Sequence, residues 1–330
     1  MVIAQAAAVP TAAEQGATAG RTEVRHLVVD EAGEGQRLDN FLLRHLKGVP
    51  KSHVYRIVRS GEVRVDGRRA GVDDRLAIGE TVRVPPIRLA QPANSAVAPA
   101  REFPVLFEDD HLLIIDKPAG VAVHGGSGVS SGVIEQLRAA RQPKFLELAH
   151  RIDRETSGIL VLAKRRSALT AVQADLRNGG NFGGHAGGWK KEYRLAVFGQ
   201  PTFERKEVKL ALTKDTGANG ERHVRVDEDG QYALTRFAVQ QRYAHGALLS
   251  ARIATGRTHQ IRVHAQSLGL PLVGDERYGD FALNKARKVG RMLLHAARLE
   301  LTHPASGERL VVESPLPADF QRELDKLDSP

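Results

Sequence analysis

The apolar positions of the N-terminal region predict two short helices. Four apolar residues recur at helical spacing: Leu38, Phe41, Leu42 and Leu46. This spacing is typical of an amphipathic helix within residues 36–46. Pro50 ends that segment, and a second helix is expected over residues 53–59. Ser52 has a side chain suited to an N-cap, and Gly61 stands where a left-handed residue commonly ends a helix.

Strand-like runs flank these helices. One covers residues 22–30, and two more strands are expected at 62–65 and 81–84. Asp66-Gly67 is a typical two-residue hairpin turn. We therefore expect residues 22–85 to form a small α/β domain. Four basic residues cluster in it: Lys51, Arg56, Arg59 and Arg64.

A Pro- and Ala-rich stretch without periodicity follows, and we interpret residues 86–103 as an inter-domain linker. Residues 104–330 then form a second domain. Its apolar runs predict strands at 112–117, 145–148, 159–163 and 192–197 and helices at 132–140 and 168–176. At the other end of the chain, residues 1–21 are Ala-rich and predict a disordered leader.

A highly charged loop lies between two of the predicted strands. Asp153 is flanked there by Arg151 and Arg154, and a Thr-Ser-Gly turn ending at Gly158 leads into the next strand. A neighbouring guanidinium favours the ionised carboxylate, which can then act as a nucleophile or a base. The loop taken alone favours an exposed salt-bridged surface over a reactive site.

A second candidate segment runs from a strand through Gly256 into a helix. Thr258 is placed to cap this helix, and Gly269 to end it. Helical spacing directs Ile261, Ala265 and Leu268 toward the core and puts His259, Arg262 and Gln266 together on another face. Arg257 and the free N–H groups of the first turn would form an anion site. A further run, Gly274-Asp275-x-x-Tyr278-Gly279, predicts a turn.

Composition narrows the classes of function. The chain has 330 residues, 42% of them hydrophobic, and no apolar run near the length of a membrane span. It contains no cysteine, which excludes disulfides, thiol catalysis and Cys-ligated metals and is compatible with a cytoplasmic protein. The formal charge of +9 favours a polyanionic partner such as nucleic acid.

Neither a nucleotide cofactor nor a metal is predicted. The Gly-rich stretch 179–188 has Trp189 where a phosphate-binding loop requires lysine, and the stretch 125–128 lacks the Lys-Ser/Thr sequel as well. His259 and His264 are five residues apart, which does not match a zinc-binding His-Glu-x-x-His helix. We therefore expect chemistry without a cofactor.

Two resemblances connect these features. Arg37-Leu38-Asp39, followed by Ser52 and by Gly61-x-Val-x-Val-Asp-Gly67, resembles an S4 RNA-binding module. The second domain resembles the RluA family of pseudouridine synthases through motifs that occur in the family's order: His150-Arg-Ile-Asp-Arg-Glu-Thr-Ser-Gly158, Lys191-x-Tyr193, Gly256-Arg-Thr-His-Gln-Ile-Arg-Val-His264 and Leu294-His-Ala296. Ile152 replaces the commoner Leu, and the stretch 179–188 is longer than usual for the family.

The resemblance implies an α+β protein: a small S4-like RNA-binding module and a catalytic domain with a mixed, mainly antiparallel sheet. It implies Asp153 as the nucleophile that attacks the ribose or promotes glycal formation, Arg262 as its ion-pair partner, and Tyr193 as the residue that stacks on the base and relays a proton. Arg151 would fill the gap left by a flipped-out uridine. The remaining RNA contacts implied are Arg257, His259, Lys51, Ser52, Arg56 and Arg59, with Arg257 and His259 either contacting phosphate or supporting the loop.

The resemblance also suggests a substrate. Residues 48–52 and 123–128 are similar to the branch of the family that modifies 23S ribosomal RNA. We expect a cytoplasmic, monomeric isomerase that needs no cofactor and binds 23S ribosomal RNA or a ribosomal precursor particle. A synthase directed at transfer RNA and a non-catalytic ribosome-assembly factor are the alternatives. Asp153, Arg262 and Tyr193 together favour the enzyme.

Overall fold

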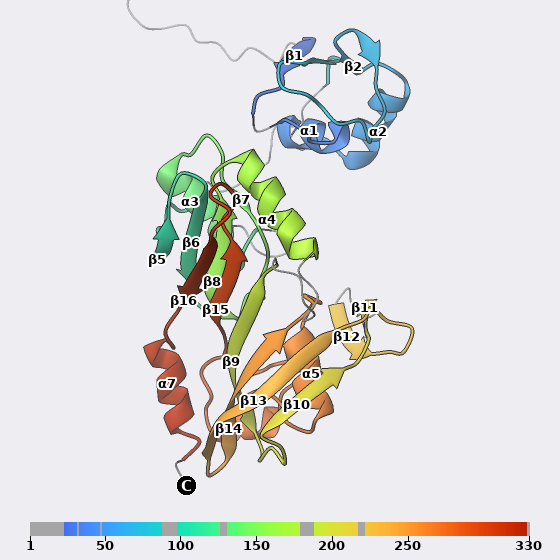
Figure 1. The fold of residues 1–330 in the computed structure, drawn as a ribbon. Helices are drawn as coiled ribbons and strands as arrows, with labels where there is room; N and C mark the ends of the chain where they lie inside the picture. The colour runs from blue at the N-terminus through green and yellow to red at the C-terminus, as the bar shows by residue number, and fades with distance from the viewer. Residues whose placement is uncertain are drawn as a thin grey trace, which may run out of the picture. The chain divides into compact units, whose positions relative to one another are not determined.

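The computed structural model describes residues 23–31, 33–46, 48–87, 98–125, 131–178, 188–216 and 222–328. The chain divides into two compact units, Met1–Ser95 and Ala96–Pro330, and each is described by itself (Figure 1). The predicted leader, part of the predicted linker and nearly all of the Gly-rich stretch 179–188 lie outside the described residues. None of the described helices combines the length and the apolar character that a membrane crossing requires.

The N-terminal unit packs two helices on a small antiparallel sheet. The helices are α1 (Leu38–His45) and α2 (Lys51–Arg59), and the strand order is β1 (Arg25–Val28), β4 (Thr81–Val84), β2 (Arg64–Val65), β3 (Arg68–Arg69). The four predicted apolar residues of the first helix are buried in one core with three from α2: Val54, Ile57 and Val58. The predicted pair of helices and the predicted hairpin are confirmed.

The turns of this unit agree with the sequence in one place and differ in another. Asp66 and Gly67 have φ angles of 46° and 76°, as a two-residue hairpin requires. Ser52 is not the N-cap of α2. The carbonyl of Pro50 already accepts hydrogen bonds from the N–H groups of His53 and Val54, so the helix begins at Lys51 and Ser52 lies in its first turn.

The C-terminal unit is built on a sheet of ten strands. The main path runs β10 (Arg205–Lys209), β13 (Leu234–Tyr243), β14 (Gly246–Ile253), β9 (Lys190–Phe198), β15 (Leu294–Thr302), β8 (Ser157–Ala163), β6 (Leu112–Lys117), β5 (Val105–Glu108). In addition, β16 (Arg309–Glu313) pairs with β15 and β7 (Glu147–Leu148) pairs with β8. Among the described strands only β8 and β15 pair in parallel. The expected mixed, mainly antiparallel sheet is confirmed.

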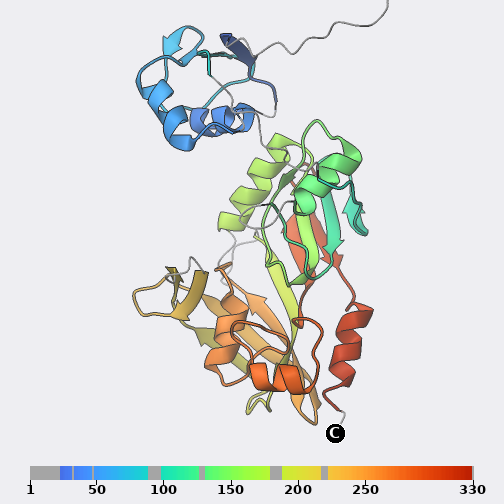
Figure 2. The same ribbon diagram turned by 180° about the vertical axis from the view of Figure 1, so that it is seen from behind.

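Helices cover both faces of this sheet (Figures 1 and 2). The helices α4 (Arg166–Asn178) and α5 (Gln260–Ser267) share one core with alternate residues of the strands, whereas α3 (Val133–Arg141) and α7 (Ala318–Asp325) pack in other clusters. In β6, Leu112 and Ile114 belong to the first core and Leu113 and Ile115 to the core under α3. Burial on both faces explains why these strands are apolar at consecutive positions.

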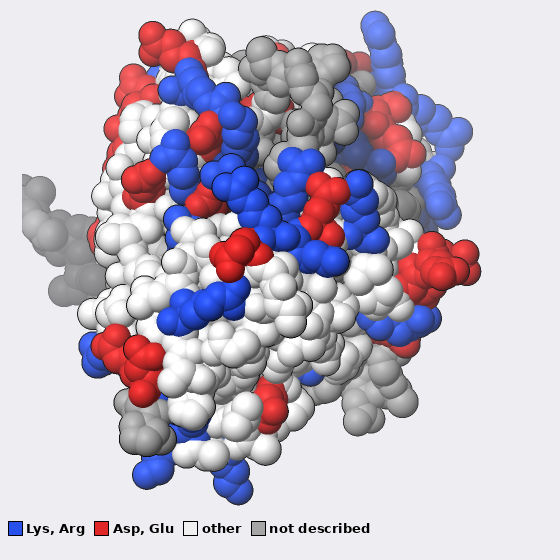
Figure 3. Space-filling view, turned by 60° about the horizontal axis from the view of Figure 1, so that its bottom comes forward, with Lys and Arg blue, Asp and Glu red and all other residues white. Residues whose placement is uncertain are grey.

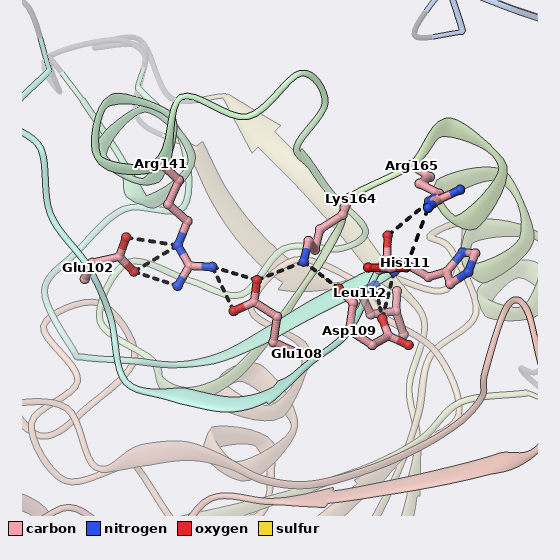
Figure 4. A network of polar contacts seen from close by, with 9 residues as sticks. Glu102, Glu108, Asp109, His111, Leu112, Arg141, Lys164 and Arg165 are labelled. Atoms are coloured by element: carbon pink, nitrogen blue, oxygen red, sulfur yellow. Dashed lines mark hydrogen bonds and ion pairs between the residues drawn. The ribbon is translucent and has the colours of Figure 1, made fainter.

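A network of charged residues fixes the beginning of the unit (Figure 4). Arg141, the last residue of α3, donates hydrogen bonds to the carboxylates of Glu102 and Glu108 at 2.7–3.0 Å. Lys164 at the end of β8 donates to the same Glu108 at 2.9 Å. Each exposed pair contributes little, but the shared carboxylate joins three chain segments around the edge strand β5.

The two halves of the sheet meet where β8 begins. Ser157 pairs with His295 and Gly158 with Ala296. Gly158 has a φ of +102°, and a Cβ added there would lie 2.3 Å from the carbonyl oxygen of Ala296. A glycine is therefore required both by the backbone conformation and by the close approach of β15.

We predict that Gly158→Ala lowers the free energy of unfolding of this unit by more than about 2 kcal/mol, because strain and a steric clash add. Gly269→Ala is the matched control: Gly269 also has a positive φ of +70°, but nothing lies within 4 Å of an added Cβ. Denaturant unfolding followed by the fluorescence of Trp189, the single tryptophan, measures both. Equal losses in the two variants would contradict the clash.

Candidate active site

A cleft of about 830 Å³ opens on the face of the sheet that carries α4 and α5. Its walls are the loop before β8, the start of β9 and the segment that leads into α5. The sequence-predicted residues of the C-terminal unit all line it: Arg151, Asp153, Tyr193, Arg257, His259 and Arg262. The structure thus brings together residues that are far apart in the sequence.

Asp153 lies on the loop before β8 and faces Arg262 of α5. Nη1 of Arg262 is 3.3 Å from Oδ2 of Asp153. The side chain of Asp153 is 28% exposed, whereas that of Arg262 is 6% exposed. The carboxylate therefore has one oxygen held by a buried cation and remains open to the cleft, as a reacting group must be.

Arg262 is itself held by Asp275, a residue for which the sequence predicted no role. Nε and Nη2 of Arg262 each donate to a carboxylate oxygen of Asp275 at 2.7 Å, and Asp275 is fully buried. Burial opposes ionisation of Asp275, but Arg262 and the N–H groups of Tyr278 and Arg277 outweigh it and hold its pKa below the usual range. The bidentate pair leaves only Nη1 of Arg262 directed at Asp153.

Tyr193 lies on β9 with its ring in the cleft and is 8% exposed. Burial, together with the nearby charge of Asp153, raises the pKa of its phenol. The side chain is therefore a neutral aromatic surface beside the carboxylate, suited to stacking on a base.

His259 and Tyr278 form a second support for the carboxylate. Tyr278 Oη accepts a hydrogen bond from the N–H of Val224 and lies 2.9 Å from Nδ1 of His259. Among the described residues this nitrogen is the one acceptor within reach of the hydroxyl, which leaves the imidazole proton on Nε2. Nε2 lies 3.9 Å from Oδ2 of Asp153. Val224 belongs to the separate hairpin of β11 (Leu212–Thr216) and β12 (Arg222–Val226).

The start of α5 differs from the prediction. The helix begins at Gln260, and its N-cap is His259, in the left-handed region with a φ of 53° and without a capping side-chain hydrogen bond. Thr258 is therefore not the cap, because the chain is not yet helical at the residue that follows it. This conformation turns His259 toward Asp153, so it does not share a face with Gln266, which is exposed.

Lys117, the last residue of β6, holds the loop before β8 in place. Its ammonium group is fully buried and donates to the carbonyl oxygens of Pro118 at 2.8 Å, Val121 at 2.8 Å and Arg154 at 3.0 Å. All three of its hydrogens are used. Burial lowers the pKa of Lys117 to about 7, a cost that the three acceptors offset. Because Arg154 follows Asp153 directly, this contact fixes the backbone beside the carboxylate.

Arg151 and Arg257 are exposed arginines of the cleft. Arg151 lines the cleft and a neighbouring groove of about 1450 Å³. Arg257 donates from Nε to the carbonyl of Tyr232 at 3.1 Å, and its backbone N–H donates to Oε1 of Gln260. The predicted anion site at the start of α5 is thus partly occupied by the protein's own acceptors.

The four candidates of the N-terminal unit lie together on α2. Lys51, Ser52, Arg56 and Arg59 are exposed and line a shallow surface with Tyr55. Lys51 Nζ and Arg59 Cζ lie 5.3 and 5.8 Å from the ring of Tyr55. The Tyr55 hydroxyl donates to Asp39 at 2.7 Å. Figure 3 shows Lys and Arg side chains on one face of the molecule, with Asp and Glu side chains among them.

Comparisons with known proteins agree with this arrangement. A family model described as RNA pseudouridylate synthase matches residues 111–267, and an S4 domain model matches residues 36–82. The chain belongs to the RNA pseudouridylate synthase family and is an isomerase that carries an S4 domain. The family resemblance, the fold class and the enzyme class predicted from the sequence are confirmed.

Particular relatives are similar over most of the chain. The Ribosomal large subunit pseudouridine synthase C of Escherichia coli (strain K12) is 46% identical over 313 residues, 91% of this chain and 95% of the relative. That of Haemophilus influenzae is 44% identical over 316 residues, 93% and 96% of the two chains. The solved structure of Human RNA Pseudouridylate Synthase Domain Containing 4 has a TM-score of 0.55 at 26% identity, covering 68% of this chain and 92% of that one.

No group of His, Asp and Glu side chains among the described residues is arranged to hold a metal ion. The sequence missed Asp275, Tyr278 and Lys117 as parts of the site. The first two lie in the Gly-Asp-x-x-Tyr-Gly run, which predicted only a turn, and the third ends a buried apolar strand, where a charged residue needs a partner.

We predict that Asp275→Asn costs about 3–5 kcal/mol of stability, because it removes the buried bidentate partner of Arg262 and leaves that buried guanidinium only its single contact with Asp153. The rate of pseudouridine formation should also fall, since Arg262 then loses its fixed direction. Glu207→Gln is the control: it removes the carboxylate that accepts from Nε of Arg236 at 2.6 Å, but the two side chains are 34% and 45% exposed, so the loss of stability should be far smaller than that of Asp275→Asn. Denaturant midpoints and rates on cellular RNA test both. Similar costs would contradict the buried pair's role.

Proposed function

We propose that this protein isomerises specific uridines to pseudouridine in large-subunit (23S) ribosomal RNA, with Asp153 as the nucleophile on a flipped-out uridine. The observation that carries the chemistry is the carboxylate of Asp153, held by Arg262 and open to a cleft that also contains Tyr193. The ribosomal substrate is supported by relatives that cover nearly the whole chain and are named for the ribosomal large subunit.

The reaction balances without a cofactor. The C1′–N1 bond breaks with its electron pair passing to the uracil, the base turns, and a C1′–C5 bond forms. C5 then loses a proton and N1 gains one. Asp153 either bonds to C1′ and is displaced when the C1′–C5 bond forms, or takes the C2′ proton to give a glycal and returns it to C2′ as that bond forms. Both routes use one carboxylate. Arg262 pairs with this carboxylate and fixes its direction.

Tyr193 and Arg151 would hold the substrate in the required conformation. A uridine inside a helix has to leave the stack before its ribose can reach Asp153, at a cost of a few kcal/mol. We infer that the ring of Tyr193 stacks on the extruded base and that its phenol relays the proton at C5. Arg151, exposed at the junction of the cleft and the neighbouring groove, would occupy the gap in the RNA.

Phosphate contacts would complete binding. The neighbouring groove is lined by several arginines, Arg257 and Arg291 among them, and we assign Arg257 to the RNA backbone. His259, close to Asp153, takes the role of loop support. Lys51, Ser52, Arg56 and Arg59 would contact phosphates from the N-terminal unit. We further propose domains at 22–85 and 104–330 joined by residues 86–103, and a cytoplasmic monomer that acts on the RNA or on a precursor particle.

Asp153→Asn should abolish isomerisation and leave RNA affinity within about threefold, because the substitution removes no phosphate contact. The measurement is pseudouridine mapping of 23S ribosomal RNA, by carbodiimide modification and reverse transcription, in cells lacking the protein. Wild type should restore the missing modifications and Asp153→Asn should not. Normal turnover by the variant would overturn the nucleophile. An unchanged 23S map with activity on transfer RNA would overturn only the substrate.

Replacing Lys51, Arg56 and Arg59 with Ala should make the negative slope of log affinity against log salt shallower by about two to three units. Each lost phosphate contact removes roughly 0.7–0.9 from the magnitude of that slope. Titration of labelled ribosomal RNA at several salt concentrations measures the slope. Arg322→Ala, on the exposed side of α7, is the control and should leave it unchanged. An unaltered slope in the triple variant would remove α2 from the RNA interface.

A further inference from the structure

Lys191 stands out among the residues of the cleft because the mechanism above does not use it. It precedes Tyr193 by two residues on β9, so both side chains project from the same face of the strand, about 6.7 Å apart along it. Both line the cleft that holds Asp153. Lys190, its neighbour, is exposed on the opposite face and pairs with Glu300 at 3.4 Å.

The ammonium group of Lys191 has no acidic partner among the described residues. Its Nζ lies 5.6 Å from the ring centroid of Trp189, and a Cβ added at Gly256 would be 3.7 Å from it. Burial lowers the pKa of Lys191 to about 8, so most of the group is still charged at pH 7. An unpaired cation in a partly desolvated cleft is costly unless a ligand supplies the missing charge.

The neighbours of Lys191 in the cleft indicate what that ligand is. Lys191 and Tyr193 project from one face of β9 into the cleft that also holds Asp153. With the ribose at Asp153 and the uracil stacked on Tyr193, the edge of the base farthest from C1′ would face Lys191. That edge carries a carbonyl oxygen of the uracil.

We propose that Lys191 is a further catalytic residue, which donates a hydrogen bond from its ammonium group to a carbonyl oxygen of the uracil and stabilises the anion formed when the C1′–N1 bond breaks. The inference rests on the proposed position of the ribose at Asp153. The electron pair of the broken bond is delocalised over N1 and the two carbonyl oxygens, so a cation at the far edge stabilises the departing base more than the neutral uridine. Lys191 neither gains nor loses a bond in the step.

Among the groups of the cleft whose pKa is shifted by burial, Lys191 is the one with a value near 8. Lys117, which holds the loop beside Asp153, has a pKa of about 7, and because it is unchanged in every variant its contribution to the pH profile is common to all of them. Burial lowers the pKa of His150 to about 3 and also lowers that of His259, and it raises the pKa of Tyr193. The remaining charged groups that line the cleft are arginines and the carboxylate: Arg151, Arg177, Arg257, Arg262 and Asp153. His124 also lines it.

The test compares Lys191→Met and Lys191→Arg with wild type. Single-turnover rates are measured between pH 6.5 and 9.5 with excess enzyme on unfractionated RNA from cells that lack the protein, so that any natural target is present. Wild type should slow above about pH 8. Lys191→Met should be on the order of 100-fold slower without that alkaline decline. Lys191→Arg should recover much of the rate and lose the decline, because guanidinium stays charged.

Two further variants make the outcomes distinguishable. Lys190→Met, the matched control, should behave as wild type, and unfolding followed by Trp189 fluorescence establishes that each variant is folded. A folded Lys191→Met within threefold of wild type, or one that keeps the alkaline decline, overturns the role of Lys191. Asp153→Asn in the same assay tests the proposed function separately: if Asp153→Asn is inactive and Lys191→Met is not, only the lysine is rejected.

Discussion

The site depends on a buried ion pair between Arg262 and Asp275. Two charges removed from water are tolerated because the pair is bidentate and because backbone N–H groups also satisfy Asp275. The pair consumes two of the donor positions of the guanidinium and directs the third at Asp153. A flexible arginine at the surface would neutralise the carboxylate equally well, but it would not fix where the carboxylate points. The buried pair thus fixes the direction in which Arg262 faces Asp153.

Around this pair, the fold immobilises a loop that has no regular structure of its own. Lys117 holds the carbonyl of Arg154 from β6, and Ser157 donates to the imidazole of His295 at 2.9 Å while accepting from Arg291 at 2.6 Å. On the other side, Tyr278 connects His259 to the hairpin of β11 and β12. The loop is therefore held on the C-terminal side of Asp153 and stays partly open to the cleft at Asp153 itself.

Sequence reasoning predicted what depends on local pattern and missed what depends on partners far along the chain. The apolar periodicity of α1 and the strands identified the fold, and the motifs identified the family. The structure places Asp153, Tyr193 and Arg262 in one cleft, and their roles remain predictions. Asp275 and Lys117 were missed because burial of a charge is visible only with its partners in place. Both predicted N-caps, Ser52 and Thr258, were wrong because Pro50 and the left-handed His259 set the helix starts.

The position of β15 has a consequence for the order in which the chain folds during synthesis. This strand lies between β8 and β9 and joins the two halves of the sheet, yet it begins only at Leu294. The N-terminal unit contains all of its own strands within residues 25–84 and can fold as soon as these are synthesised. A nascent chain can therefore complete its S4 domain well before the sheet of the C-terminal unit closes. We expect a chain truncated before β15 to occupy RNA without modifying it.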